Sequence, residues 1–334
     1  MNIFAVTGND VVRFTLTDGW ATDAQTVLAH AGARCVAVDP GDPRRVYVGT
    51  FDSGTFSSDD GGESWRTAEE GLEDERVLSL GVSSCDVHSG TGVVYAGTEP
   101  SNLYRSEDGG RRWERLSALR DLPSEPTWSF PPRPWTHHVS TIALHPTDPG
   151  GILVGIELGG VMRSRDRGAS WIDHNREAHR DAHRLLTHPL ARDRVYEIAG
   201  QGIAVSDDRG DTWRRDEEGL DRHYAWVGAI DPDDPDLWYA SISRSPYAAH
   251  GGGDGQARLL RQEAKGGGWT PIDGWGDDAP LRRMPYAITT LPGRHGALLV
   301  GLRGGTMLLT TDAGDTWSRL ALELSDVVDM AAAP

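Results

Sequence analysis

A short turn signature recurs five times along this 334-residue chain and constrains its fold more than any other feature. Each copy reads Ser/Thr-x-Asp-x-Gly-x-x-Trp. The copies occupy residues 58–65, 106–113, 164–171, 206–213 and 310–317. Self-similarity at intervals of about 20–50 residues is the mark of an architecture built from repeated units. The chain is therefore expected to fold as a series of like supersecondary structures.

The signature has a mechanical explanation. An aspartate two residues before a glycine can accept hydrogen bonds from backbone N–H groups of its own turn, and the glycine supplies a positive φ. The tryptophan then begins the next strand and is expected to bury its ring. We expect each copy to close a hairpin between the third and fourth strands of a unit. Because scaffolding recurs in every unit and an active site does not, the five aspartates are predicted to be structural.

Two weaker copies complete the count. Gly266 precedes Trp269 by three residues, as in the intact signatures, and residues 17–20 read Thr-Asp-Gly-Trp. This gives seven unit tryptophans, near residues 20, 65, 113, 171, 213, 269 and 317. Within the units, apolar and β-branched runs alternate with Pro/Gly/Asp turns and predict short strands. The clearest runs are residues 35–38, 46–50, 55–58, 141–144, 152–155, 227–230 and 237–240.

The two ends of the chain supply complementary pieces of one unit. Residues 326–330 resemble a first strand with nothing after it, and residues 2–7 and 11–16 resemble second and third strands. Pairing them would close a ring and leave no free sheet edge at the seam. The sequence therefore predicts one all-β domain over residues 1–334. It would be a seven-bladed β-propeller of four-stranded antiparallel blades, closed by N-terminal strands pairing with a C-terminal strand.

These repeats resemble the Asp-box (BNR) propeller superfamily. That superfamily includes sialidases, xyloglucan-cleaving glycoside hydrolases, sortilin-type receptors and the photosystem II stability/assembly factor family. The resemblance covers essentially the whole chain, and a single ring of this length is most similar in layout to the assembly factors. It implies a propeller that holds a partner with an arginine-lined patch, although superfamily members have unrelated functions.

Composition narrows the classes of function. The formal net charge is −17, which argues against general nucleic-acid binding because such proteins present a basic surface. No apolar run is long enough to span a bilayer, and the first residues lack the features of a signal peptide. The two cysteines, Cys35 and Cys85, are expected to be buried free thiols on neighbouring first strands. We expect a cytoplasmic, monomeric protein without nucleic-acid or membrane partners.

A binding site is expected at the ring axis, on the face where the chain enters each first strand. Loops entering the third to sixth blades are rich in histidine, arginine and aromatic residues, which are costly near an axis unless they bind something. The predicted ligand-binding residues are Trp135, His137, His138, His183, Arg184, His223, Tyr224, Arg244, Arg283, Tyr286 and Arg303. Residues 241–257 form an insertion of the length expected for a lid or binding loop.

Three interpretations of this set remain open. The groups could bind a protein partner or a small anionic or carbohydrate ligand, with arginines holding carboxylate or phosphate. His137 or His138 together with His183 and His223 could hold a metal. However, their spacing follows the blades and no local ligand motif, so we predict no metal and no cofactor. The groups could also simply pair with one another in the channel.

An enzyme and a binding protein remain alternatives. A glycoside hydrolase needs two carboxylates on either side of the scissile bond. The candidates are Asp52, Glu99 and Glu157, which lie in second-to-third strand loops of adjacent blades and would be catalytic only in a hydrolase. The preferred prediction is a binding propeller with a His/Arg/aromatic-lined axial pocket. The alternative is a sialidase- or xyloglucanase-like hydrolase.

Overall fold

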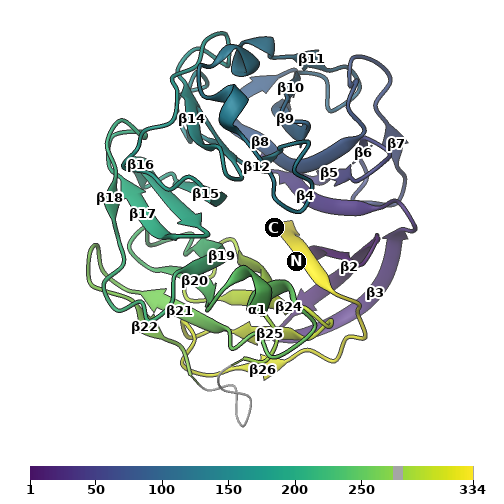
Figure 1. The fold of residues 1–334 in the computed structure, drawn as a ribbon. Helices are drawn as coiled ribbons and strands as arrows, with labels where there is room; N and C mark the ends of the chain where they lie inside the picture. The colour runs from purple at the N-terminus through teal and green to yellow at the C-terminus, as the bar shows by residue number, and fades with distance from the viewer. Residues whose placement is uncertain (274–280, 334) are drawn as a thin grey trace.

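Seven antiparallel sheets form a ring in the computed structural model, which describes residues 1–273 and 281–333 (Figure 1). We number the sheets as blades from the first complete one. Blade one is β4 (Ala33–Asp39), β5 (Asp42–Thr50), β6 (Thr55–Ser58) and β7 (Arg66–Thr67). Blade two is β8 (Arg76–His88), β9 (Thr91–Glu99), β10 (Leu103–Ser106) and β11 (Glu114–Arg115). Blade three is β12 (Val139–Leu144), β13 (Ile152–Ile156) and β14 (Gly160–Ser164).

The remaining blades follow in chain order. Blade four is β15 (Ala182–His188), β16 (Ala191–Ala199), β17 (Gly202–Ser206) and β18 (Arg214–Arg215). Blade five is β19 (Tyr224–Ile230), β20 (Trp238–Ser243), β21 (Arg258–Gln262) and β22 (Thr270–Pro271). Blade six is β23 (Pro285–Thr290), β24 (Leu298–Leu302), β25 (Met307–Thr310) and β26 (Ser318–Arg319). Blade seven is β27 (Val327–Ala333), β1 (Asn2–Thr7), β2 (Asp10–Thr17) and β3 (Trp20–Leu28).

The predicted seven-bladed propeller is confirmed, with small differences in strand limits. Blade three has three strands, and an isolated bridge between Arg163 and Ile172 takes the place of a fourth. The predicted strand at residues 237–240 instead begins at Trp238 and runs to Ser243. The predicted third strand at residues 55–58 matches β6.

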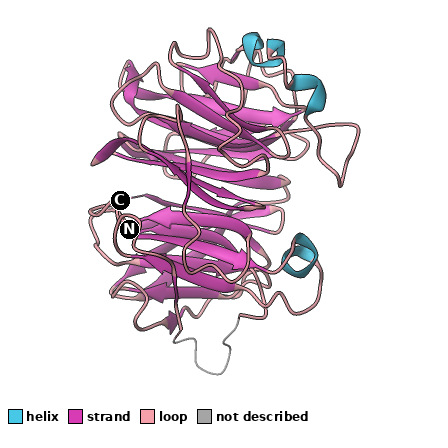
Figure 2. Cartoon of the chain, turned by 60° about the vertical axis from the view of Figure 1, so that its left-hand side comes forward, coloured by secondary structure: helices cyan, strands magenta, loops and turns pink. Residues whose placement is uncertain are grey.

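The ring closes at the predicted seam. β27 pairs with β1 in antiparallel register, from Asn2 opposite Ala333 to Thr7 opposite Val327. β1 then pairs with β2, so N-terminal strands complete a blade that begins at the C-terminus. Figure 2 shows the two chain ends side by side. Val327 is fully buried and packs in the core between blades six and seven, which ties the seam to its neighbour.

The intact turn signatures share one hydrogen-bond pattern. In the first copy, Ser58 Oγ donates to Asp60 Oδ1 at 2.7 Å and accepts from Gly62 N at 2.8 Å. Asp60 also accepts from Ser64 N at 2.9 Å. Gly62 has a φ of +87°, a conformation that other residues resist. The same backbone donation to the aspartate recurs at Asp108, Asp166, Asp208 and Asp312. The predicted structural role of the turn follows from these contacts.

The two weaker copies differ from the intact ones. Trp269 is buried, but its indole N–H donates to Asp216 O, whereas Trp213 donates within its own turn to Gly210 O. Residues 17–20 do form the hairpin between β2 and β3. The expectation that Trp20 buries its ring is wrong, because 72% of this residue is exposed. Its short turn starts the outermost strand, which is largely exposed along its length.

Second strands form the packed interior of the ring. All five residues of β13 and of β24 are buried, because each second strand has blades on both sides. This explains why the strands are continuous apolar runs without alternation.

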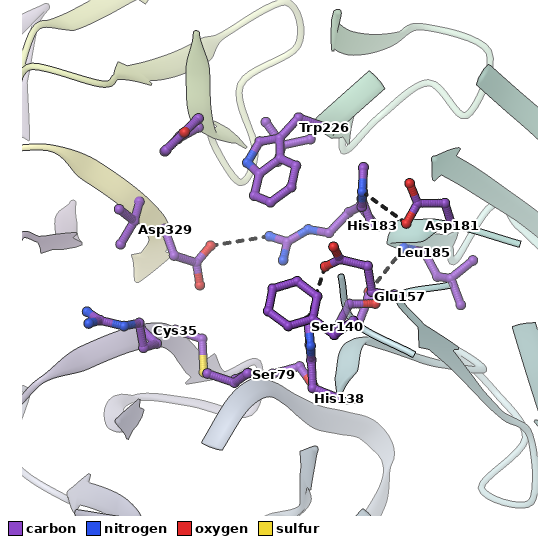
Figure 3. A pocket seen from close by; sticks show the side chains of 18 of the residues that line it. Cys35, Ser79, His138, Ser140, Glu157, Asp181, His183, Leu185, Trp226 and Asp329 are labelled. Carbon is purple, nitrogen blue, oxygen red and sulfur yellow. Dashed lines mark hydrogen bonds and ion pairs between the residues drawn. The ribbon is translucent and has the colours of Figure 1, made fainter. Parts of the chain in front are cut away.

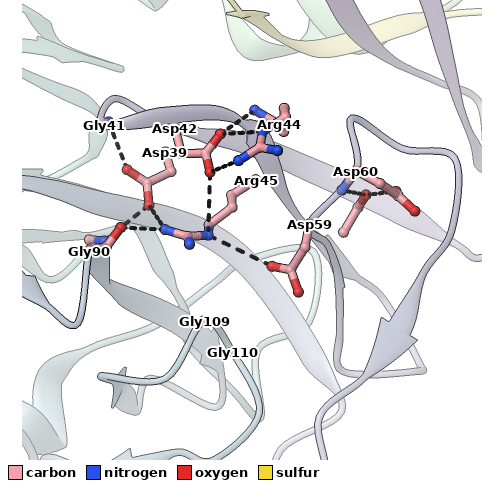
Figure 4. A network of polar contacts seen from close by, with 12 residues as sticks. Asp39, Gly41, Asp42, Arg44, Arg45, Asp59, Asp60, Gly90, Gly109 and Gly110 are labelled. Carbon is pink, nitrogen blue, oxygen red and sulfur yellow. Dashed lines mark hydrogen bonds and ion pairs between the residues drawn. The ribbon is translucent and has the colours of Figure 1, made fainter.

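Neighbouring blades are also tied by polar groups on the signature face (Figure 4). Arg45 donates to Gly90 O of the next blade at 2.5 Å. Buried Asp39 accepts from Gly41 N at 2.8 Å and from Gly92 N at 3.0 Å. The aspartate that ends this first strand therefore connects its own turn to the adjacent blade.

Helices are few and short. η1 (Ser117–Asp121) and η2 (Glu125–Thr127) lie between blades two and three, and α1 (Pro246–His250) lies in the predicted insertion. Figure 2 shows these helices on one side of the sheets. In the described part of the chain, none of them has the length and apolar character needed to cross a bilayer.

Candidate functional site

A cavity of about 950 Å³ lies at the ring axis (Figure 3). Its lining includes residues from the first strand of every blade: β4, β8, β12, β15, β19, β23 and β27. Much of the wall is apolar, and its apolar members include Val36, Phe51, Leu78, Leu80, Phe130, Ile142, Leu158, Leu185, Leu186, Trp226, Val227 and Val328. The cavity therefore combines apolar surface with a small number of polar groups, as ligand sites generally do.

One wall is a hydrogen-bonded group of aromatic side chains around His250. Tyr224 Oη lies 2.5 Å from His250 Nε2, and Tyr286 Oη lies 2.5 Å from His250 Nδ1. The Trp226 ring packs edge-on to His250, with centroids 4.6 Å apart. Burial, aided by the nearby His183, lowers the pKa of His250 to about 4. His250 is therefore neutral at physiological pH, and its ring is held by hydrogen bonds at both nitrogens.

The next wall carries two histidines and two carboxylates. His138 Nε2 lies 3.2 Å from Glu157 Oε2. His183 Nδ1 donates to Ala225 O at 2.7 Å, and its Nε2 lies 3.6 Å from Asp181 Oδ1. Burial favours neutral His183, but Asp181 and Glu157 outweigh it and raise the pKa of this imidazole.

An arginine–aspartate pair spans the cavity between blades four and seven. Arg184 Nη2 lies 3.4 Å from Asp329 Oδ1. Asp329 also accepts from Val36 N at 3.0 Å. Burial raises the pKa of Asp329, although Arg184 opposes this shift. The long distance and the 33% exposure of the Arg184 side chain leave guanidinium donors available to a ligand.

Arginines and phenylalanines form another part of the wall. The guanidinium carbons of Arg34 and Arg133 lie 5.3 Å and 5.4 Å from the centroid of the Phe51 ring. Arg133 also lies 4.6 Å from the Phe130 centroid. These distances permit cation–π attraction. They place positive charge beside apolar surface at the cavity.

The structure brings together about half of the predicted site residues. Six side chains line the cavity, and they are His138, Glu157, His183, Arg184, Tyr224 and Tyr286. Eight lie outside the lining, and they are Asp52, Glu99, Trp135, His137, His223, Arg244, Arg283 and Arg303. The expectation that all of them converge at the axis therefore needs correction.

The predicted ligand-binding residues that lie outside fall into two groups, of which the first faces solvent. Trp135 is 78% exposed, and Arg244 and Arg283 are exposed. His223, whose side chain is 55% exposed, lies near Glu217. Because His223 lies outside the cavity, the histidine set considered for a metal does not converge.

The second group is engaged in local contacts. His137 packs edge-on against Trp128, with centroids 5.4 Å apart. Arg303 donates to the backbone carbonyls of His250 and Gly251, so it fixes the end of α1.

The predicted catalytic carboxylates are also dispersed. Asp52 is exposed and accepts a hydrogen bond from Ser53 Oγ at 3.2 Å. Glu99 is buried and paired with Arg76, at 3.0 Å, and with Arg133. Although burial opposes it, Arg133 lowers the pKa of Glu99, which does not suit a general acid. Of the three, only Glu157 lines the cavity.

Several polar and aromatic lining residues were not among the predicted binding residues, and they include Asp181, Trp226, His250 and Asp329. Asp181 and Trp226 stand beside residues that were selected, and His250 lies in the insertion. Asp329 lies in the predicted closing strand, so the ring closure itself was the signal that could have placed it at the axis.

Comparisons with known proteins identify the fold. No family model matches the chain, and no curated protein matches it. The GH74 xyloglucanase from Xanthomonas campestris is similar in structure, with 18% identity and a TM-score of 0.66. That match covers 86% of this chain and 45% of the xyloglucanase, so the chain spans less than half the length of that enzyme.

Two structures of a shorter protein also match. YCF48 from Cyanidioschyzon merolae has 18% identity and a TM-score of 0.62, over 88% of this chain and 86% of that one. YCF48 bound to D1 peptide has 16% identity and a TM-score of 0.58, over 86% and 82%. At these identities the likeness concerns the fold. The chain is a seven-bladed β-propeller, consistent with the Asp-box propellers that its repeats resemble.

Proposed function

We propose that this propeller is a cytoplasmic binding protein that takes up a ligand or a segment of a partner in its axial cavity. The observation that carries the proposal is the cavity itself, which has about 950 Å³ and draws lining residues from all seven blades. This volume lies within the range of about 300–1,000 Å³ that is typical of ligand sites. Two free cysteines are compatible with a reducing compartment.

The lining favours an occupant that has both an apolar part and an anionic group. Arg184 offers donors that its distant partner Asp329 does not fully use. Guanidinium groups bind carboxylates with two parallel hydrogen bonds. Trp226 and Phe130 supply flat apolar surface for the rest of the occupant.

A peptide segment satisfies these requirements best. Similar folds occur in YCF48 bound to D1 peptide and in the nidogen/laminin complex, which support a protein partner for this ring. A small carbohydrate or organic anion would use the same arginine and aromatic surface. The shared chemistry is an anionic group beside an apolar body.

Binding of the protein to an immobilised peptide array would test this proposal. The affinities of the peptides that bind most strongly would then be measured by fluorescence anisotropy. Arg184→Gln should weaken capture of acidic-apolar peptides at least about tenfold, the loss expected for a charged group at the centre of a site. Arg244→Gln is the matched control, because Arg244 is exposed outside the cavity, and it should leave capture unchanged. Equal affinities for the two variants would refute an axial site.

A glycoside hydrolase remains the second candidate because of a different carboxylate pair. Oxygens of Glu157 and Asp181 lie within 4.8 Å of each other at the cavity wall. Retaining hydrolases place two carboxyl groups about 5–5.5 Å apart. If the protein is a hydrolase, it should cleave some members of a broad chromogenic glycoside panel, and Glu157→Gln should abolish that cleavage. A panel without turnover would exclude this candidate for the glycosides tested.

A further inference from the structure

Three potential metal ligands meet at the wall of the axial cavity. Glu157 follows β13 of blade three, while Asp181 and His183 stand at the start of β15 in blade four. One ligand atom from each lies within 4.8 Å of the other two (Figure 3). Adjacent blades therefore bring an imidazole and two carboxylates together from positions that no local sequence motif would connect.

The hydrogen bonding of His183 fixes which ring nitrogen faces the carboxylates. Its Nδ1 lies 2.7 Å from Ala225 O, and a carbonyl oxygen can only accept, so Nδ1 carries a proton. In the neutral imidazole this leaves a lone pair on Nε2, which faces Asp181. An N–H group bonded to a backbone carbonyl is the arrangement that orients metal-binding histidines.

The facing atoms have no hydrogen-bond partner among the described residues. His183 Nε2 and Asp181 Oδ1 are both buried, and both lack one. The His183 side chain is 3% exposed. Their separation of 3.6 Å is too long for a hydrogen bond. It matches the separation of about 3.3–3.6 Å between two ligands that each lie about 2.0–2.2 Å from one tetrahedral ion.

We propose that Glu157, Asp181 and His183 hold one divalent transition-metal ion at the wall of the axial cavity. Two carboxylates and a neutral imidazole present a charge of −2, which such an ion neutralises. An imidazole ligand favours zinc or a similar transition metal over Mg²⁺ and Ca²⁺, which prefer oxygen ligands. Three protein ligands leave a coordination position open toward the cavity.

His138 completes the site as a positioning residue. Its Nε2 lies 3.2 Å from Glu157 Oε2, and its ring packs edge-on against Phe130 with centroids 4.7 Å apart. This contact orients the Glu157 carboxylate. Outer partners of this kind change metal affinity by about 10–100-fold.

Ion binding can be measured without any knowledge of the ligand, so this inference stands apart from the proposed function. Tag-free protein stripped with EDTA would be titrated with ZnCl₂ in a calorimeter, and with CoCl₂ in a spectrophotometer. We expect one Zn²⁺ per chain, a visible Co²⁺ spectrum of low coordination number, and much weaker binding of Mg²⁺.

Two substitutions assign the ligands. Asp181→Asn preserves the shape of the side chain and removes its charge, and it should weaken Zn²⁺ binding at least about 100-fold, beyond the effect of an outer partner. His183→Gln should do the same, and circular dichroism would establish that it folds. Asp52→Asn is the control, because that carboxylate is exposed outside the cavity.

Each result of these titrations either supports or overturns the metal site. Failure of the wild-type protein to bind Zn²⁺ would overturn the proposal. Stoichiometric binding that Asp181→Asn leaves unchanged would also overturn it, because the ion would then lie elsewhere. If His183→Gln does not fold, Asp181→Asn and Glu157→Gln decide the question.

Discussion

Substituting each of two adjacent aspartates in the first turn signature, Asp59 and Asp60, tests whether the signature stabilises the ring. Asp60 accepts hydrogen bonds from Ser58 Oγ at 2.7 Å, Ser64 N at 2.9 Å and Ser64 Oγ at 2.6 Å. Asp59, its neighbour, forms an ion pair with Arg66 at 2.6 Å. It also lies 3.8 Å from Arg111 and 3.8 Å from Arg45, and Figure 4 shows the contact with Arg45. Both side chains are exposed, so Asp60→Ala and Asp59→Ala differ mainly in whether they remove the bonds of the turn.

The hydrogen bonds of Asp60 and its lowered pKa both set the loss of unfolding free energy expected for Asp60→Ala. Three exposed hydrogen bonds at about 0.5 kcal/mol each give about 1.5 kcal/mol for Asp60→Ala. Hydrogen bonds from Ser64 and Ser58 lower the pKa of Asp60 from 3.8 to about 2. This shift corresponds to at most about 2.4 kcal/mol, which solvent screening reduces to about 1 kcal/mol. An exposed ion pair such as that of Asp59 contributes about 0.5 kcal/mol.

The pH dependence has a definite sign. A carboxyl group whose folded pKa is lowered stabilises the fold above its unfolded value, and that contribution is lost as pH falls through the folded value. The stability gap between wild type and Asp60→Ala should thus be constant above about pH 5. It should narrow as pH falls from about 5 and close only below the folded pKa of about 2.

Differential scanning calorimetry and urea titration would measure both effects. The entropy of unfolding for 334 residues is about 0.7 kcal/mol/K, so a loss of about 1.5 kcal/mol lowers the Tm by about 2 °C. Asp59→Ala should lower it by less than about 1 °C. Equal shifts for the two variants, or a gap that does not narrow between pH 5 and pH 2, would refute the assignment of the turn hydrogen bonds to Asp60.

Three further substitutions and one deletion probe the packing. Gly71 has a φ of +83°, and an added Cβ would lie 1.9 Å from Trp113 O. Gly71→Ala should therefore lower the free energy of unfolding, measured in urea, by at least about 3 kcal/mol. In the same assay, Trp213→Ala should lower the free energy of unfolding by about 3–5 kcal/mol, because Trp213 is buried. Trp20→Ala should change it by less than about 0.5 kcal/mol, because Trp20 is largely exposed. Deletion of residues 326–334 removes β27 and should abolish the cooperative calorimetric transition.

The sequence was sufficient to predict the architecture because the decisive features are local. A turn signature is held by hydrogen bonds within seven residues, as between Ser58 and Ser64, so each copy reports one blade wherever it occurs. Ring closure followed from the incomplete strand sets at the two termini. The decayed copy at Trp269 was recognisable because its glycine and tryptophan keep their spacing.

The site was less predictable because distance from the axis changes sharply along the chain. Trp135, His223 and Arg283 precede the first strands of their blades by only a few residues, yet they lie outside the cavity. Arg244 and Arg303 follow second strands, which lie a strand spacing of about 4.8 Å farther from the axis. Of the predicted residues that line the cavity, His183, Arg184, Tyr224 and Tyr286 lie on first strands. His138 and Glu157 reach it from loops, so residue type near a first strand does not decide which side chains face inward.

Contacts across the ring are harder still to predict from the sequence. Arg184 and Asp329 are 145 residues apart and meet because blades four and seven face each other across the cavity. His250 reaches the cavity from an insertion whose course no repeat pattern specifies. Repeats specify how each blade is built, whereas the axial contacts depend on residues in which the blades differ.

Closure of the ring and completion of the cavity are the same structural event. β27 is the first strand of blade seven, so its pairing with β1 is what carries Val328 and Asp329 to the axis. Asp329 then accepts from Val36 N of blade one and faces Arg184 of blade four. Opening the seam would leave Arg184 without this carboxylate and one side of the cavity without its wall. Any occupant held by Arg184 in the closed ring therefore stabilises the pairing of the two chain ends by mass action.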